Sequence, residues 1–155
     1  MAMPGTIRQF LENSSLSYEI LNHPRTSSLA EAAQACHLEL HQLTRTVMLA
    51  DAEGLLMVIM AADELLDFGA LHQLLDRDLE LVPQHKLAEI FDDCEKNSCP
   101  PLAKVYGLEA IIDSKLESRD EIIFEPGSHT SLVQISGTDF NHLFDKVSYA
   151  PITRA

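Results

Sequence analysis

Residues 44–61, TRTVMLADAEGLLMVIMA, contain the two most strand-like runs in the chain. Residues 44–50 and 55–61 are mostly apolar, and the turn-forming sequence DAEG at residues 51–54 separates them. We therefore expect a β-hairpin. Its second run is far shorter than the ~20 apolar residues that a membrane-spanning helix needs. It predicts a buried strand, and no membrane partner is expected.

Helices and further strands are predicted on both sides of this hairpin. We expect helices at residues 4–11, 29–36, 67–75, 83–91 and 136–146. We expect strands at residues 16–21, 79–82, 108–113, 121–125 and 132–135. This order lacks the strict alternation of strand and helix that is typical of doubly wound sheets, so it predicts a mixed α/β (α+β) fold. In that fold a largely antiparallel mixed sheet, or partial barrel, is surrounded by helices.

The length and composition predict how the chain is organised. It has 155 residues, of which 46% are hydrophobic and 23% charged, as in a soluble globular protein. We expect one domain over residues 1–155, with a frayed tail at residues 148–155. Three cysteines are an odd and sparse set that favours a reducing compartment, and the first residues hold no apolar run typical of a signal peptide. The sequence thus predicts a cytoplasmic protein.

The charge of the chain limits its partners. Asp and Glu number 24 against 11 Lys and Arg, which gives a net charge of −13. Such a surface repels polyanions at long range, so binding to duplex DNA is not expected, although a small local basic site is still allowed.

The sequence contains none of the common catalytic signatures. It has no GxSxG, no glycine-rich phosphate loop and no HExxH. His37 and His41 have the spacing of one helical face, but no second pair of metal-binding residues accompanies them, so neither a metal nor another cofactor is expected. Acidic residues at positions 92, 93 and 95 crowd Cys94, which disfavours a thiolate nucleophile.

The loop at residues 91–104 is long and polar, and Pro100 and Pro101 stiffen it. Rigid loops often line binding sites, and their backbone N–H groups can stabilise a developing oxyanion. A purely structural crossover loop accounts for the same composition equally well.

Four stretches of the chain resemble one known family. They are FDDCEKNSCPPLAKVYGLEAIIDSKL (residues 91–116), EIIFEPGSHTSLVQISGTDF (121–140), YEILNHPRTSSLAEAA (18–33) and LTRTVMLAD (43–51). They are similar to the YbaK/prolyl-tRNA-synthetase-associated family of aminoacyl-tRNA editing domains, over nearly the whole chain. The resemblance implies a single mixed α/β domain that hydrolyses the ester between a wrong amino acid and the 3′ end of a tRNA. Such a domain acts as a second sieve and needs no protein nucleophile.

The resemblance also implies which residues form the site. Arg45 stands where relatives have a lysine at the start of the hairpin, and it would anchor the 3′ end of the tRNA. Asn97 stands at a loop glycine of the family, and asparagine tolerates the left-handed backbone better than most residues. The backbone of this loop would stabilise the oxyanion, and its predicted substrate-binding residues are Asn97, Ser98, Cys99, Pro100 and Pro101.

Four further residues are predicted from the same resemblance. Asp113 and His129 would orient the amino acid and a water molecule, and with Arg45 they are the predicted catalytic residues. Asp113 could equally cap residues 114–116, and His129 could equally be an exposed turn residue. His23 and Thr26 would border the pocket and contact substrate, or merely shape a turn.

Two functions stay open from the sequence alone. The first is a trans-editing deacylase, whose partners are the acceptor end of an aminoacyl-tRNA and, as a further candidate, an aminoacyl-tRNA synthetase. The second is a binding module of the same fold that has lost activity and recognises an amino acid, a nucleotide-like ligand or a protein. It is suggested by Asn97 and by Ala103, which replaces a second glycine of the family.

Overall fold

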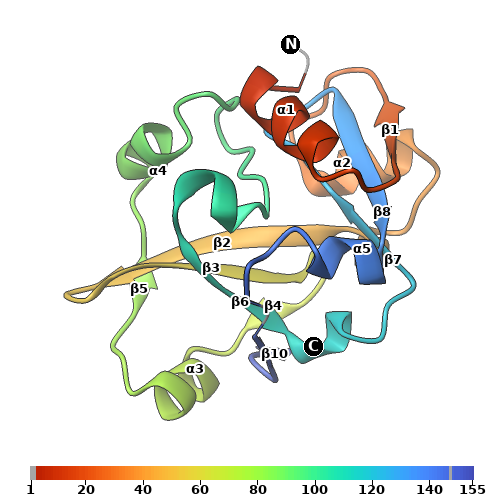
Figure 1. The fold of residues 1–155 in the computed structure, drawn as a ribbon. Helices are drawn as coiled ribbons and strands as arrows, with labels where there is room; N and C mark the ends of the chain where they lie inside the picture. The colour runs from red at the N-terminus through yellow and green to blue at the C-terminus, as the bar shows by residue number, and fades with distance from the viewer. Residues whose placement is uncertain (1–2, 147) are drawn as a thin grey trace.

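The computed structural model describes residues 3–146 and 148–155, and its strands form three sheets with helices packed around them (Figure 1). The α-helices are α1 (Gly5–Asn13), α2 (Leu29–Ala35), α3 (Phe68–Leu75), α4 (Gln84–Ile90) and α5 (Gly137–Asn141). The 3-10 helices are η1 (Leu40–Gln42), η2 (Ala103–Tyr106) and η3 (Ser114–Leu116). The strands are β1 (Tyr18–Asn22), β2 (Thr44–Asp51), β3 (Gly54–Ala61), β4 (Leu65–Leu66), β5 (Glu80–Leu81), β6 (Glu109–Asp113), β7 (Glu121–Phe124), β8 (Ser131–Ser136), β9 (Tyr149–Ala150) and β10 (Thr153–Arg154). The predicted mixed α/β fold is confirmed.

The predicted hairpin forms the centre of the largest sheet, whose strand order is β5-β2-β3-β6-β9. Strands β2 and β3 pair antiparallel along their full length, from Thr44 opposite Ala61 to Asp51 opposite Gly54. Strand β6 then adds parallel to β3, and β9 parallel to β6. The sheet is therefore mixed, as predicted.

A second sheet, ordered β1-β8-β7, is entirely antiparallel. It meets the first sheet where β2 begins: Leu43 forms a parallel bridge with Ile123, and the Thr44 hydroxyl donates to the Ile123 carbonyl at 3.4 Å. The start of the hairpin and the end of β7 therefore lie side by side.

The core beneath this junction holds the end of β7 in place. Ile7 and Leu11 lie four residues apart on one face of α1, and both are fully buried. They belong to the same core cluster as Phe124 and Phe140, whose ring centroids are 6.1 Å apart. Burying one side chain of this size stabilises the fold by ~2–3 kcal/mol. Phe124 is the last residue of β7, so this packing also fixes the position of the next residue, Glu125.

The predicted helix starts are confirmed by their caps. The hydroxyl of Ser28 accepts the N–H of Glu31, and the carboxylate of Asp67 accepts the N–H of Ala70. The last predicted helix is shorter than expected, because α5 ends at Asn141. No helix in the two described ranges is long and apolar enough to cross a lipid bilayer.

The prediction of a frayed tail is wrong. Strand β9 pairs with β6, and β10 pairs with β4. Ile152 between them is fully buried, and its N–H donates to Asp113 at 3.0 Å. Apolar burial and paired backbone groups hold this segment in place. Its sequence is short and has polar residues around the apolar ones, so it did not indicate this order.

Candidate functional site

A cavity of about 190 Å³ lies at the junction of the two sheets. Segments far apart in the sequence line it: the beginnings of α2 and β2, the proline-containing loop and the end of β7. Its lining residues are Leu29, Thr44, Arg45, Thr46, Asn97, Cys99, Pro101, Phe124 and Glu125. The volume corresponds to about six water molecules, so the cavity suits a small chemical group rather than a whole drug-sized ligand.

Arg45, the second residue of β2, lines the cavity. One of its nitrogens, Nη2, donates to the Glu64 carbonyl at 3.2 Å. Its Nε atom is buried and finds no hydrogen-bond partner within the described residues. An unpaired buried donor is unfavourable, so this guanidinium is suited to an acceptor that a ligand brings.

The proline-containing loop faces Arg45 across the same cavity. Asn97 has a φ of 68°, the left-handed conformation expected where relatives have glycine. The N–H of Ser98 donates to the Glu95 carbonyl at 3.0 Å, whereas the amides of Asn97 and Cys99 have no acceptor in the part of the chain that the structure describes. Both residues with unpaired amides, Asn97 and Cys99, belong to the lining of the cavity.

Ala103 does not disturb this loop. It lies in η2 and is not among the described residues with a positive φ. The backbone at Asn97 and Ala103 therefore has a conformation that each residue can adopt. This argues against a loop whose conformation was lost when the glycines were replaced.

Glu125 is a buried carboxylate at the cavity wall, with 7% of its surface exposed. Its Oε2 atom lies 3.3 Å from Nδ1 of His129, and Nε2 of His129 lies 2.6 Å from the Lys96 carbonyl. A carbonyl only accepts, so Nε2 carries a hydrogen. A second proton must then lie between Nδ1 and the carboxyl group, because two lone pairs at this distance repel each other.

The electrostatics of the pair favour this shared proton. Burial raises the pKa of Glu125, and the nearby His129, Ser98 and His23 oppose this only in part. Burial by itself lowers the pKa of His129, but the Lys96 carbonyl and the charge of Glu125 outweigh it and raise the pKa above its usual value. Both ring nitrogens of His129 are occupied, so this ring positions its neighbours and is not a free base.

Asp113 is not brought to the cavity. It is fully buried; one carboxylate oxygen accepts the N–H of Ile152 at 3.0 Å, and the other accepts the N–H of Lys115 at 3.2 Å. The structure therefore corrects the substrate-orienting role predicted for Asp113, and the alternative, a cap for η3, is what it shows.

His23, Thr26, Ser98 and Pro100 surround the cavity without lining it. Nδ1 of His23 lies 2.7 Å from the Pro24 carbonyl, and the N–H of Thr26 donates to the His129 carbonyl at 3.1 Å. Pro100 and Ser98 are buried. Nε2 of His23 and Oγ of Ser98 are buried without a hydrogen-bond partner among the described residues, as Nε of Arg45 is, so their predicted contact with substrate stays a prediction.

The cysteines near the cavity are protonated thiols. Burial raises the pKa of Cys99 to about 11 and that of Cys94 to about 12. In the described ranges no three His, Cys, Asp or Glu side chains form a group that could hold a metal ion. The charged side chains that line the cavity are Arg45 and Glu125.

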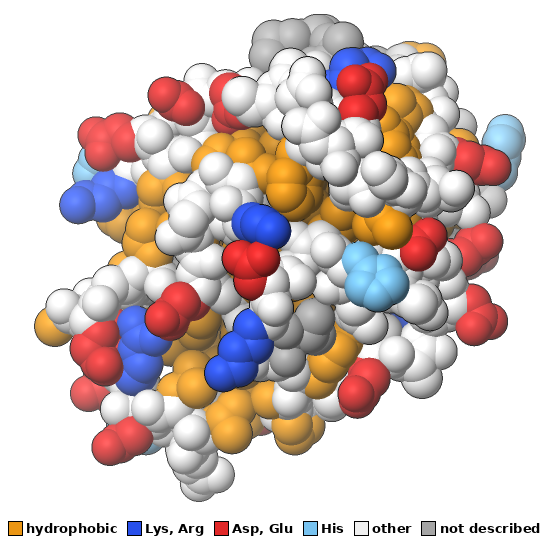
Figure 2. Space-filling model, in the orientation of Figure 1, with side chains coloured by type: hydrophobic (Ala, Val, Ile, Leu, Met, Phe, Trp, Pro, Cys, Tyr) orange, Lys and Arg blue, Asp and Glu red, His pale blue; other side chains and the backbone are white. Residues whose placement is uncertain are grey.

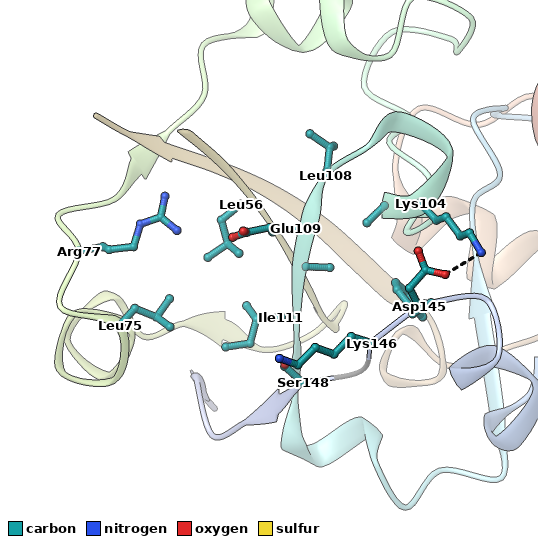
Figure 3. Close-up of a pocket in the computed structure, with 13 residues that line it drawn as sticks. Leu56, Leu75, Arg77, Lys104, Leu108, Glu109, Ile111, Asp145, Lys146 and Ser148 are labelled. Atoms are coloured by element: carbon teal, nitrogen blue, oxygen red, sulfur yellow. Dashed lines mark ion pairs between the residues drawn. The ribbon is translucent and has the colours of Figure 1, made fainter. Parts of the chain in front are cut away.

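Two larger cavities are also present, and some of their charged groups are paired. One of about 440 Å³ lies over β6, between Leu75 and Asp145 (Figure 3). There Lys104 pairs with Asp145 at 2.7 Å, and Arg77 pairs with Asp51 at 2.7 Å. Figure 2 shows the same pattern over this face, where basic side chains adjoin acidic ones. A further cavity of about 640 Å³ separates α4 from residues 91–99.

Glu125 was missed by the sequence analysis. The available signal was an acidic residue directly after the apolar run IIF, just before the Pro126-Gly127 turn. A carboxylate next to a buried strand is itself partly buried, which is uncommon unless the group is paired.

The sequence also matches a known family. The profile of the aminoacyl-tRNA editing domain family matches residues 23–143. No curated protein matches the chain.

Several solved structures share the fold. A protein from Marinobacter aquaeolei VT8, proposed to act in signal transduction, has a TM-score of 0.80 at 20% identity; 99% of this chain is covered, but only 31% of that protein. A protein proposed as a trans-editing enzyme for prolyl-tRNA synthetase has a TM-score of 0.83 at 19% identity. The match covers 99% of this chain and 100% of that protein. The hypothetical protein APE2540 has a TM-score of 0.85 at 18% identity. The match covers 96% of this chain and 99% of that protein. At these identities the likeness concerns the fold alone.

Proposed function

The chain belongs to the family of aminoacyl-tRNA editing domains, and on that premise we propose that it is a trans-editing deacylase. It hydrolyses the ester that joins a small, wrongly attached amino acid to the 3′ end of a tRNA. Its partner is the acceptor end of that tRNA in the cytoplasm, and an aminoacyl-tRNA synthetase is a candidate second partner.

The reaction needs positioning more than it needs a nucleophile. A water molecule attacks the ester carbonyl carbon, and the bond from that carbon to the 3′ oxygen breaks. The leaving oxygen takes a proton, which gives a free amino acid and a free terminal hydroxyl. Because the ester is already activated, a site that orients it and stabilises the oxyanion is sufficient. A site whose cysteines are protonated thiols is compatible with this route.

The residues of the cavity take complementary roles. The amides of Asn97 and Cys99 stabilise the oxyanion, and one donor of this kind contributes roughly 10²–10³-fold to the rate. Arg45 binds the phosphate next to the terminal nucleoside, because a guanidinium fork fits phosphate oxygens.

The cavity is the single observation that carries this proposal. It joins a guanidinium with an unpaired Nε, two backbone amides without acceptors and a buried carboxylate within about 190 Å³. A volume of about 190 Å³ is of the size that a small amino-acid side chain needs, as a second editing sieve requires.

The test is a deacylation assay on a panel of mischarged tRNAs. The intact chain should hydrolyse esters of small amino acids, and Arg45→Ala should lower kcat/KM at least about tenfold by removing a charged contact. Arg8→Ala is the matched control, since Arg8 is an exposed arginine on α1 that does not line the cavity. If no ester is hydrolysed above its spontaneous rate, the proposed activity is wrong.

A further inference from the structure

Glu125 and Arg45 have opposite charges and line the same small cavity, yet no ion pair joins them among the described residues. Glu125 is the only acidic residue and Arg45 the only basic residue of that lining. Arg45 instead donates to the Glu64 carbonyl. The cavity therefore presents two separate charged ends to whatever enters it.

A buried carboxylate is unfavourable unless it has partners. His129 provides one contact, at 3.3 Å to Oε2. This is longer than the 2.7–2.9 Å typical of a charge-assisted hydrogen bond. The burial of Glu125 outweighs what the nearby His129, Ser98 and His23 offer its charge, so a cationic group from a ligand would complete its environment.

The terminus of an aminoacyl-tRNA has matching charges. It carries a phosphate on one side of the ester and the α-ammonium group of the amino acid on the other. We propose, building on the proposed function, that Glu125 binds this α-ammonium group and that the domain thereby selects amino acids whose α-amino group is free. An ester with a blocked or missing amino group leaves Glu125 buried without that partner, and is rejected for this reason.

His129 positions the carboxylate for this contact. The ring is fixed by the Lys96 carbonyl at Nε2, and its backbone N–H donates to Oε2 of Glu95 at 2.7 Å. Glu95 is itself paired with Arg25. The other titratable groups that act on Glu125 are His23 and Cys99. An ammonium group bound to Glu125 would therefore change the pKa of His129.

A binding experiment separates this inference from catalysis. The probes are 3′-alanylamino-3′-deoxyadenosine, which carries the α-ammonium group and cannot be hydrolysed as an ester, and its lactyl counterpart, which has a hydroxyl in that place. We expect the intact chain to bind the alanyl compound more tightly, by on the order of tenfold, in a calorimetric titration. Glu125→Gln should remove that preference, while Glu121→Gln, at the exposed start of the same strand, should keep it.

A second readout tests the mechanism. In an NMR titration the alanyl compound should lower the pKa of His129, since it brings positive charge next to Glu125, and the lactyl compound should not. Equal affinities for the two compounds, or binding of neither, would overturn the inference. Preference for the alanyl compound in a chain that hydrolyses no ester would support the inference and contradict the proposed activity instead. Comparing the thermal unfolding of Glu125→Gln with that of the intact chain verifies that the variant is folded.

Discussion

The Nε2 atom of His129 lies 2.6 Å from the Lys96 carbonyl, and this contact ties the turn after β7 to the proline-containing loop. Two more hydrogen bonds join the same segments: the His129 N–H donates to the Glu95 carboxylate at 2.7 Å, and the Glu95 N–H donates to the Gly127 carbonyl at 3.0 Å. The carboxylate and the loop amides of the cavity are therefore held in one arrangement.

His129→Ala should slow deacylation by misplacing the loop. A displacement of about 1 Å at a reacting centre costs on the order of 10²-fold in rate. We expect kcat to fall by about that factor in single-turnover assays, with a smaller change in KM. His142→Ala, an exposed histidine after α5, serves as the control. An unchanged kcat in His129→Ala would show that the loop holds its position without the ring.

Asp113→Ala should affect stability and leave the chemistry intact. The change leaves the buried amide of Ile152 without its acceptor, which costs about 1–3 kcal/mol of unfolding free energy, and it removes the cap from the amide of the exposed Lys115. Urea unfolding measures this loss. At a temperature where the variant is folded, its kcat should match that of the intact chain. A fall in kcat of the size caused by Arg45→Ala would instead place Asp113 in the catalytic machinery.

Substitutions at Asn97 should report on its backbone conformation. Alanine at a φ of 68° is less favourable by about 1–2 kcal/mol, whereas glycine adopts this conformation freely. We therefore expect Asn97→Ala to lower the melting temperature and the deacylation rate, and Asn97→Gly to preserve both. Equal behaviour of the two variants would mean that the asparagine side chain, rather than its backbone, is what the loop uses.

Asp51 should make stability depend on pH in the acid range. The hydrogen bond from Arg77 lowers the pKa of Asp51 to about 2, burial opposes this, and the N–H groups of Glu53 and Gly54 add to it. A carboxyl with a lowered pKa in the folded state stabilises the fold above its unfolded pKa of about 4, and this contribution disappears as the pH falls towards 2.

Asp51→Asn should therefore lower the melting temperature at pH 6. The difference in melting temperature between the variant and the intact chain should become smaller as the pH falls from 4 to 2. Asp120→Asn is the control, because Asp120 is exposed. A difference that stays constant over this range would contradict the assignment.

Local patterns explain what could be predicted. The hairpin at residues 44–61 follows from two apolar runs around a turn, and the caps at Ser28 and Asp67 follow from residue type and position. The left-handed Asn97 was implied by the family resemblance, which places a glycine at this position. The hairpin and the caps depend on neighbours within a few residues.

Long-range contacts explain what was missed. The frayed tail was predicted because residues 148–155 carry no strong strand pattern, yet β9 and β10 pair with strands far away in the sequence. Asp113 was assigned to substrate because the sequence cannot show that Ile152 occupies its carboxylate. Glu125 gained significance only when His129 and the loop were placed beside it.

By itself, the sequence determined the fold class, the hairpin and several helix starts. Only the tertiary structure decided which charged groups are left unpaired at the cavity. Local structure depends on backbone preferences and periodicity that adjacent residues encode, whereas burial and pairing of a charge depend on atoms brought together from across the chain. That is why Arg45 was a candidate only through the family resemblance, and Glu125 became one only in the folded protein.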